Sequence, residues 1–464
     1  MLARAFYTLI LLLLAPVLLI GLYKKKPNKP HFGARWKEHF GFTPKLKCTK
    51  RPIWIHAVSV GESILACSII KELKLQSPDL PILVTTTTST GAEQIAKLGN
   101  LVEHRYMPID FGFAIRRFLK VVEPKQLIII ETELWPNTLH QVAKQGIKIS
   151  VINARLSEKS CRNYAKVQAL FNSINHSVAR WLCQSDADAQ RFIRLGVNPK
   201  NINVTGSIKF DIRIDDSVEQ QGHKLREWLG LQRPIWIAAS THKDEDEQVL
   251  EAHKNVLLEH PNALLILVPR HPERFDSVFE LCRSNNLQTI RRTNNQPVKS
   301  ITQVYLADTM GEMLMLLKAS NVCFMGGSLI GHKVGGHNVL EPAALNIPTI
   351  TGPSFFNFKE ITKALIEQNG IWVCQDSNQL AEQVNELFSS SEKGEQLAHN
   401  AYQLVEQNRG ALSRLPCASC LVPSVSTLPV TLVANEANLL NLEIRCMGRF
   451  LSFADIKVLS ENQG

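Results

Sequence analysis

The sequence predicts an α/β protein built from two Rossmann-like domains that face each other across a cleft, preceded by an N-terminal membrane anchor helix. Short apolar runs that suit buried parallel strands alternate with segments of helical periodicity, and a set of this kind occurs in each half of the chain. Polar motifs directly follow several of these runs, where ligands bind in open parallel sheets. A long apolar stretch at the start of the 464-residue chain predicts the anchor.

The predicted anchor occupies residues 1–23. From Ala5 to Leu22 the chain is almost wholly apolar and about long enough to cross a bilayer, although Pro16 interrupts it. Basic residues follow at once, namely Lys24, Lys25, Lys26 and Lys29, whereas only Arg4 precedes the stretch. By the positive-inside rule the body of the protein is cytoplasmic. A cleaved signal peptide is the alternative, but the small-residue cleavage pattern is missing, so we expect an uncleaved anchor that spans the bilayer or lies in one leaflet.

The N-terminal domain is expected at residues 24–212. Its first strand lies within Pro52–Val60, and a helical pattern follows from Ile64 to Leu75. A strand at Pro81–Thr88 and a helix that begins near Thr90 repeat this arrangement. The remaining strands are four short apolar runs at residues 127–130, 148–152, 180–183 and 202–205. Such alternation indicates a parallel, doubly wound sheet.

The C-terminal domain is expected at residues 213–415, after a polar linker from Asp211 to Gln221. Its strands are the apolar runs at residues 235–239, 263–268, 301–305, 322–325 and 349–350. From Pro416 onward the chain has neither helical periodicity nor a strand–turn rhythm. Residues 416–464 are therefore treated as an atypical extension to which no chemistry is assigned.

Composition narrows the choice of partner and compartment. The net charge of +10 favours an anionic partner, such as a membrane surface or a phosphorylated substrate. Nucleic acid is disfavoured because no recognisable binding motif accompanies the charge. The ten cysteines are mostly scattered singly, which indicates a reducing compartment. No cluster has metal-ligand spacing, so no metal site is predicted.

The stretch from Gly326 to Glu341 is the most informative motif. Its glycines follow the apolar run 323–325, where a buried strand should end, and Asn338 is a candidate N-cap for the apolar segment after it. Such a helix start offers unpaired N–H groups to an anion. Glycines alone would fit any strand-to-helix connection, but the carboxylate of Glu341 is suited to a ribose diol. The motif therefore predicts a nucleotide site.

Two acidic motifs follow strands of the first half. Glu62 comes after the turn at Gly61 and can remove a proton from an incoming hydroxyl, although it could instead merely complement the helix dipole. Glu131 and Glu133 follow the strand at residues 127–130 in the same way. Several acidic groups therefore converge on one edge of the sheet, which is stronger support for a site than one carboxylate alone.

Basic groups occupy similar positions. Lys209 lies beside the predicted linker and could meet developing negative charge, although a solvated lysine is the plainer interpretation. Arg270 follows Pro269 at the end of a strand and can be presented to a phosphate or carboxylate. The segment Asp308–Glu312 opens a helix whose amides are free to face a ligand.

In this order, the motifs resemble the 3-deoxy-D-manno-octulosonic acid (Kdo) transferases, which add Kdo to the lipid A precursor. The resemblance runs from the anchor to about Arg414 and rests on six blocks, Val58–Ser63, Glu131–Asn137, Ser207–Asp211, Pro269–Phe275, Asp308–Glu312 and Gly335–Ala344. It implies a GT-B fold with CMP-Kdo held mainly by the C-terminal domain. The implied acceptor is a hydroxyl of lipid IVA, a phosphorylated and acylated glucosamine disaccharide, approached from the cytoplasmic side of the inner membrane.

The resemblance also implies residue roles. Glu62 matches the general base, and Glu131 and Lys209 match residues that support the transition state. The segments implied to contact CMP comprise Pro269, Arg270, Met310, Gly311, Glu312, Asn338, Val339, Leu340 and Glu341. The expected reaction is a direct displacement at the anomeric carbon with inversion, without a metal ion or other cofactor.

Two rival functions remain open. A membrane-anchored GT-B transferase could use a UDP-sugar and another lipid, which competition between CMP and UDP would distinguish. A non-catalytic binding protein of the same fold is disfavoured because Glu62, Arg270 and Glu341 are intact. A dinucleotide oxidoreductase is weaker still, since no GxGxxG follows the first strand.

Overall fold

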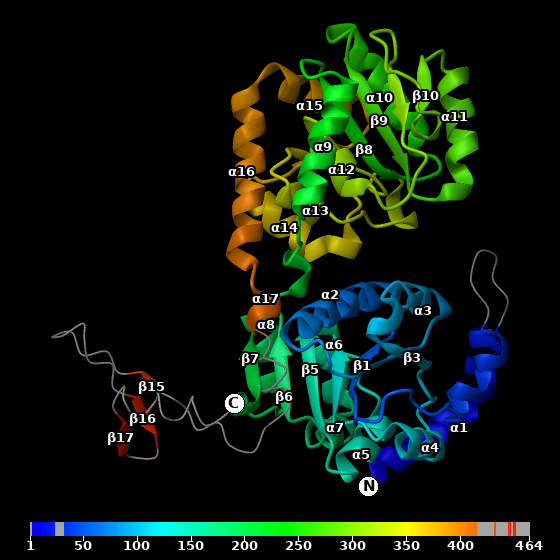
Figure 1. The fold of residues 1–464 in the computed structure, drawn as a ribbon, viewed down its shortest axis with the longest axis vertical. Coiled ribbons are helices and arrows are strands. Elements are labelled where there is room, and N and C mark those ends of the chain that lie inside the picture. Colours follow the sequence, from blue (N-terminus) through cyan, green and yellow to red (C-terminus); the bar gives the residue numbers. More distant parts are fainter. Residues whose placement is uncertain (1, 24–31, 415–430, 433–443, 447–448, 452–464) are drawn as a thin grey trace, which may run out of the picture. The chain divides into compact units, whose positions relative to one another are not determined.

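The computed structural model describes residues 2–23, 32–414, 431–432, 444–446 and 449–451. The chain divides into two compact units, one formed by Met1–Thr205 together with Leu412–Gly464 and the other by Gly206–Ala411. Each unit has its own parallel sheet with helices on both faces (Figure 1). The seven cysteines described as free, Cys48 to Cys374, form no disulfide.

The N-terminal unit contains a seven-stranded parallel sheet in the order β3-β2-β1-β4-β5-β6-β7. Its strands are β1 (Ile53–Ala57), β2 (Ile82–Thr86), β3 (Glu103–Tyr106), β4 (Gln126–Ile130), β5 (Lys148–Ala154), β6 (Arg180–Cys183) and β7 (Ile202–Val204). Its helices are α1 (Leu2–Tyr23), α2 (Val60–Gln76), α3 (Ser89–Ala96), α4 (Gly112–Val122), α5 (Pro136–Lys144), α6 (Glu158–Lys166), α7 (Gln168–Asn175) and α8 (Asp186–Arg194). A 3₁₀ helix, η1 (Gly33–Phe40), precedes β1. Every residue of β1, β2 and β4 is buried, which explains their near-continuous apolar sequences.

The C-terminal unit contains a second seven-stranded parallel sheet, in the order β10-β11-β9-β8-β12-β13-β14. Its strands are β8 (Ile235–Thr241), β9 (Leu264–Pro269), β10 (Thr289–Arg291), β11 (Val304–Leu306), β12 (Val322–Met325), β13 (Thr349–Thr351) and β14 (Trp372–Val373). Its longer helices are α9 (Asp216–Leu229), α10 (Asp246–Glu259), α11 (Phe275–Ser284), α14 (Lys359–Glu367), α15 (Ser377–Ser389) and α16 (Ser391–Asn408), and the shorter ones are α12 (Met313–Lys318) and α13 (Leu340–Ala344).

Alternation along the central strand β8 builds two separate apolar layers. Ile235, Ile237 and Ala239 belong to one layer, and Trp236 and Ala238 belong to the other. Successive side chains of a strand point to opposite faces of the sheet, so this one strand supplies both cores. Both sheets reverse their strand order beside their first strand, β1 in one unit and β8 in the other. Ligands of open α/β sheets bind at such points.

Two element predictions were wrong. The segment from Asp211 to Gln221 is not wholly a linker, because α9 begins at Asp216 and packs on α12, with Leu225 and Leu229 in the core. The first half of α9 is polar, so the apolar side of the helix shows only near its end. Asn338 is also not the N-cap, since α13 begins at Leu340 after Val339, although the Asn338 side chain accepts a hydrogen bond from the Leu340 amide at 3.2 Å.

Beyond Arg414, the described residues form a small antiparallel sheet of β15 (Thr431–Leu432), β16 (Ile444–Cys446) and β17 (Arg449–Leu451). The remainder of the predicted extension, and the basic residues Lys24, Lys25, Lys26 and Lys29, lie outside the described residues.

Candidate active site

The N-terminal unit places Glu62 in the first turn of α2, directly after β1. Ser59 caps this helix and accepts a hydrogen bond from the Glu62 amide, while the Glu62 carboxylate accepts from the Val58 amide at 2.7 Å and the Ser59 hydroxyl at 2.8 Å. This reciprocal pattern is a variant of the capping box. Glu62 therefore does stabilise the helix start, as the plainer interpretation holds, and it is also available at the carboxyl edge of the sheet.

The surroundings of Glu62 favour a proton acceptor. Only 6% of the residue is exposed, and this burial raises the pKa of its carboxyl above the usual value. The hydrogen bonds from Val58 and Ser59 oppose the shift, whereas the negative charges of Glu133 and Glu131 add to it. The structure thus brings the predicted acidic groups of β1 and β4 to the same edge. A raised pKa makes a carboxylate a better general base near neutral pH.

Glu131 adopts an unusual backbone conformation immediately after β4. Its φ of 60° lies in the left-handed region, and its amide donates to the Ile152 carbonyl at 2.9 Å. A non-glycine residue in that region costs about 1–2 kcal/mol and is common at functional sites. The strained residue turns the chain into the loop that carries Glu133 and Trp135.

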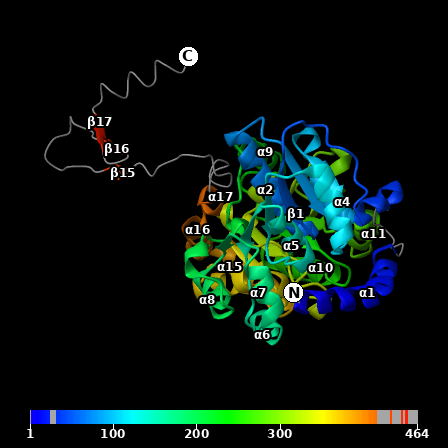
Figure 2. The same cartoon turned by 90° about the horizontal axis from the view of Figure 1, so that it is seen from below.

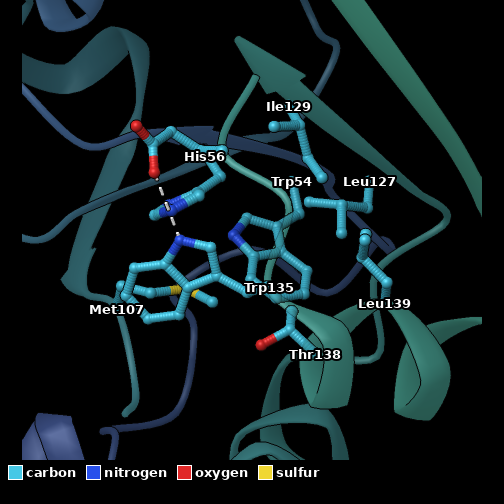
Figure 3. A pocket seen from close by; sticks show the side chains of 9 residues that line it. Trp54, His56, Met107, Leu127, Ile129, Trp135, Thr138 and Leu139 are labelled. Carbon is cyan, nitrogen blue, oxygen red and sulfur yellow. Dashed lines mark hydrogen bonds between the residues drawn. The ribbon is translucent and has the colours of Figure 1, made fainter. Parts of the chain in front are cut away.

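A small apolar pocket lies beneath this loop (Figure 3). The Trp135 ring meets His56 edge to face, with centroids 5.6 Å apart, and its Nε1 donates to Glu133 at 3.4 Å. His56 is buried, which lowers its pKa to about 4 and keeps the ring neutral. The contact of Trp135 with His56 thus fixes the loop against the sheet.

Lys209, the third predicted catalytic residue, belongs to the C-terminal unit. It lies in a single 3₁₀ turn, Ile208–Phe210, whose first and last residues are buried while Lys209 is half-exposed. The two apolar neighbours therefore fix the turn that carries Lys209.

In the C-terminal unit the glycine-rich amides are already occupied. The buried Glu245 carboxylate accepts from the amides of Gly327 at 2.7 Å, Ser328 at 2.9 Å and Leu329 at 3.0 Å, and from that of His242 at 3.2 Å. Because this carboxylate fills the nest, the amides of Gly327, Ser328 and Leu329 are not available to an anionic ligand. Sequence reasoning missed Glu245, whose only signal was a polar segment directly after β8.

Arg270 and a histidine cluster lie at the ends of β8 and β9. The Arg270 amide donates to the Thr241 carbonyl at 2.9 Å, and its side chain is exposed. His242 stacks on His337 with a 2.8 Å contact between their Nε2 atoms, and it meets His271 edge to face. Burial lowers the pKa of His242 to about 4 and that of His337 to about 3, with Arg270 contributing to both shifts. Both rings are therefore neutral near pH 7, and Arg270 is an exposed cation beside them.

Glu341 lies close enough to Arg270 for their charges to interact. Burial raises the pKa of the Glu341 carboxyl, while the Asn338 amide, which donates to it at 3.1 Å, and the charge of Arg270 oppose that shift. Val339 and Leu340 are buried in the core, at 2% and 0% exposure. Arg270, Asn338 and Glu341 thus form one mixed donor and acceptor group.

The segment Met310–Glu312 is held by a partly buried ion pair that the sequence analysis did not identify. Arg292 forms a bidentate pair with Glu312 at 2.5 and 2.7 Å, and the Thr309 hydroxyl also donates to that carboxylate. Arg292 lowers the pKa of Glu312. Met310 is exposed, and Gly311 has a φ of 87°. Glu312 therefore shapes the loop before α12.

No group of three or more potential metal-ligating side chains occurs among the residues that the structure describes. One helix in the same part of the chain, α1, is long and apolar enough to cross a membrane.

Comparison with known proteins identifies the family. A family model described as 3-deoxy-D-manno-octulosonic-acid transferase matches residues 34–212. The 3-deoxy-D-manno-octulosonic acid transferase of Haemophilus influenzae is 41% identical over 417 residues, which cover 89% of this chain and 97% of that protein. The C-terminal CMP-Kdo binding domain of WaaA from Acinetobacter baumannii is 42% identical and covers 42% of this chain and 100% of that chain, with a TM-score of 0.40.

The fold is also found in a more distant structure. Anabaena Alr3699/HepE in complex with UDP is 14% identical, covers 78% of this chain and 97% of that chain, and has a TM-score of 0.50. This likeness, together with the two parallel sheets, confirms the predicted GT-B fold with two Rossmann-like domains. The chain belongs to the 3-deoxy-D-manno-octulosonic acid transferase family and is a glycosyltransferase enzyme.

Proposed function

We propose that this enzyme transfers Kdo from CMP-Kdo to the lipid A precursor, lipid IVA, with inversion at the anomeric carbon, in the biosynthesis of the lipopolysaccharide core. The observation that carries the proposal is the buried Glu62 carboxylate, whose pKa is raised and which stands at the carboxyl edge of the first sheet. Family membership supports the choice of sugar.

In the proposed reaction, Glu62 takes the proton from an acceptor hydroxyl as that oxygen forms a bond to the anomeric carbon of Kdo. The bond from this carbon to the phosphate oxygen breaks, and CMP leaves with the bonding electrons. Glu131 and Lys209 support the transition state, Lys209 by meeting negative charge. The reaction needs no metal ion or other cofactor, so transfer should persist in excess chelator.

The donor contacts are assigned to the C-terminal unit. The exposed Arg270 guanidinium binds the cytidylate phosphate, and Glu341 with Asn338 binds the ribose hydroxyls. Backbone atoms also contribute to donor binding, at Pro269, Met310, Gly311, Val339 and Leu340. Glu312 holds the loop before α12 in place through its ion pair with Arg292. The stacked histidine pair sits beside Arg270 without adding charge.

Membrane attachment completes the proposal. The apolar helix α1 anchors the enzyme to the inner membrane with its body on the cytoplasmic side, where an acylated acceptor is within reach. The basic residues that follow α1 in the sequence support this side.

The test incubates the full chain with CMP-Kdo and lipid IVA and measures the lipid by mass spectrometry. We expect the mass of the acceptor to rise by one or more Kdo units, and the spectrum reports how many are added. An unchanged acceptor, or stronger competition by UDP than by CMP, would overturn the proposed donor and acceptor.

A further inference from the structure

The helix α1 lies along the surface of the N-terminal unit, and the unit covers only one side of it. Its less exposed residues recur every three or four positions, at Arg4, Tyr7, Leu11, Ala15, Leu19 and Leu22. This is the spacing of one helix face, and it extends from the first turn to the last. In both views α1 (dark blue) begins beside α5, and it also contacts α7 (Figures 1 and 2).

Polar side chains attach both ends of α1 to the unit. Near its start, the Tyr7 hydroxyl donates to Asp110 at 3.0 Å, and Thr8 Oγ1 accepts from the Asn137 amide at 2.9 Å. At its end, the Tyr23 hydroxyl is 2.8 Å from His39 Nδ1. Thr8 and Tyr23 are about 22 Å apart along a helix, most of the roughly 30 Å thickness of a hydrocarbon core. A helix that crossed the bilayer could not keep both contacts.

Asp110 connects this attachment to the catalytic edge of the sheet. Its buried carboxylate accepts from the backbone N–H of Asn137 at 3.0 Å and from the backbone N–H and the hydroxyl of Thr138, both at 2.6 Å. Asp110 therefore caps the start of α5. The loop that begins at Glu131 leads directly into α5. The start of α1 is therefore joined to the segment that carries a predicted catalytic carboxylate.

The opposite face of α1 is apolar and open. Phe6, Leu13, Val17 and Ile20 are each about two-thirds exposed, at 65, 71, 69 and 70%. A row of this size is unfavourable in water. In the same unit, Phe42 and Phe113 are also exposed, and the Arg117 guanidinium lies over both rings, 4.6 and 5.5 Å from their centroids. Aromatic rings beside arginine are typical of membrane interfaces.

We propose that α1 does not span the bilayer but lies in the plane of one leaflet, with its Phe6–Leu13–Val17–Ile20 face in the lipid and its Tyr7–Thr8 face fixed to Asp110 and Asn137. The partner of this surface is a phospholipid leaflet. The helix holds the catalytic edge of the N-terminal sheet at the membrane, where an acylated acceptor presents its hydroxyl. This inference rests on the membrane attachment included in the proposed function.

The test uses the full chain in liposomes of zwitterionic and anionic phospholipid. Cysteines are introduced in the pair Thr8→Cys with Asn137→Cys, and the matched control pair is Leu13→Cys with Asn137→Cys. A short bifunctional thiol reagent is added, and the joined peptides are identified by mass spectrometry. We expect the first pair to be linked equally well in liposomes and in detergent, and the control pair not to be linked. Loss of the link in liposomes, or failure of the chain to float with them, overturns the inference.

A second measurement needs no substitution near Asp110. A protease-cleavable tag is placed before Met1 and the protease is added outside sealed liposomes, where the body of the protein is also accessible. We expect cleavage without detergent, and cleavage only after detergent would show a spanning helix. Kdo transfer by the tagged chain is measured in the same liposomes. If Kdo is transferred but the tag is protected from the protease, only the in-plane position of the helix is overturned. If the tag is cleaved but no Kdo is transferred, only the proposed reaction is overturned.

Discussion

At the scale of single residues, Glu62 stabilises a helix start and is our proposed general base, two roles that usually belong to different side chains. It closes the helix start by accepting from Val58 and Ser59, and its burial makes it a stronger base than an exposed glutamate. Because both roles use the same carboxylate, loss of activity in a variant has to be separated from loss of stability.

The substitution Glu62→Gln keeps the size of the side chain and removes the base. We expect kcat for Kdo transfer to fall by about 10²–10⁴-fold, the usual contribution of general base catalysis, with CMP binding unchanged. The control is Ser59→Ala, which removes the cap but keeps the carboxylate and should cost about 1 kcal/mol of stability. Steady-state kinetics and calorimetric CMP titration measure both variants, and near-normal turnover by Glu62→Gln would exclude it as the base.

Burial keeps the His253 ring neutral. Its Nδ1 accepts from Trp236 at 3.0 Å and its Nε2 donates to the Gln303 carbonyl at 2.9 Å, and burial lowers its pKa to about 4. The unfolded chain takes up a proton near pH 6.5 while the native chain does not, so this group removes stability as the pH falls from 6.5 toward 4. Glutamine can replace both hydrogen bonds without titrating.

We therefore expect His253→Gln to gain thermal stability relative to the parent chain between pH 7 and pH 5. The two melting temperatures, measured at both pH values in the same detergent, give this difference directly. If the difference between the two chains is the same at pH 7 and pH 5, His253 is not the neutral group described here.

At the scale of elements, the parts that sequence reasoning recovered are those whose side chains are uniformly buried. Central strands such as β1, β4, β8 and β12 have apolar sequences because helices cover both of their faces. The strands β3, β10 and β14 were missed because they lie at or near sheet edges and contain polar or half-exposed residues. The position of a strand in its sheet depends on the whole fold, and the local sequence pattern does not reveal it.

The candidate residues were located in the same uneven way. Glu131 and Arg270 directly follow β4 and β9, and Glu62 lies in the first turn of the helix that follows β1. Glu245 and Arg292 could not be identified, because each acts through atoms distant in sequence, namely the Gly327–Leu329 amides and the Glu312 carboxylate. The pattern of apolar residues in a sequence predicts where a strand ends. It does not predict which side chain from another loop will contact that end.

The end of η1 gives a test at this scale. Gly41 has a φ of 81°, and a Cβ atom there would overlap the Ala114 carbonyl of α4, whereas Gly99 has a φ of 54° and open space around it. Both alanine substitutions incur the left-handed backbone cost of about 1–2 kcal/mol. Only Gly41→Ala also has to push η1 away from α4.

We expect Gly41→Ala to lower the melting temperature clearly more than Gly99→Ala does. Thermal unfolding of both variants beside the parent chain measures this. Equal effects would mean that η1 and α4 do not meet as closely as described.

At the scale of the whole molecule, we expect charge and the apolar helix to act together in membrane binding. The net charge of +10 attracts anionic lipid over a Debye length of about 10 Å in 0.1 M salt and about 3 Å in 1 M salt. The exposed face of α1 contributes an apolar term that salt does not screen.

We expect flotation with anionic liposomes to weaken as salt rises to 1 M but not to vanish, and flotation with zwitterionic liposomes to be insensitive to salt. Complete release by salt from both lipids would show that charge alone attaches the enzyme. The variant Leu13→Lys should reduce flotation at high salt, because it places a charge in the apolar row.

The carboxylate of Glu245 in the glycine-rich nest has a consequence for the order of events. It acts as a built-in counter-ion, so the loop after β12 has its hydrogen bonds before any nucleotide arrives. Capture of the donor then involves no freezing of a mobile segment, and little conformational entropy is lost on the glycine side. Under the proposed function, recognition of the donor then falls to the exposed Arg270 guanidinium, which meets its phosphate, and to Glu341 and Asn338, which meet its ribose.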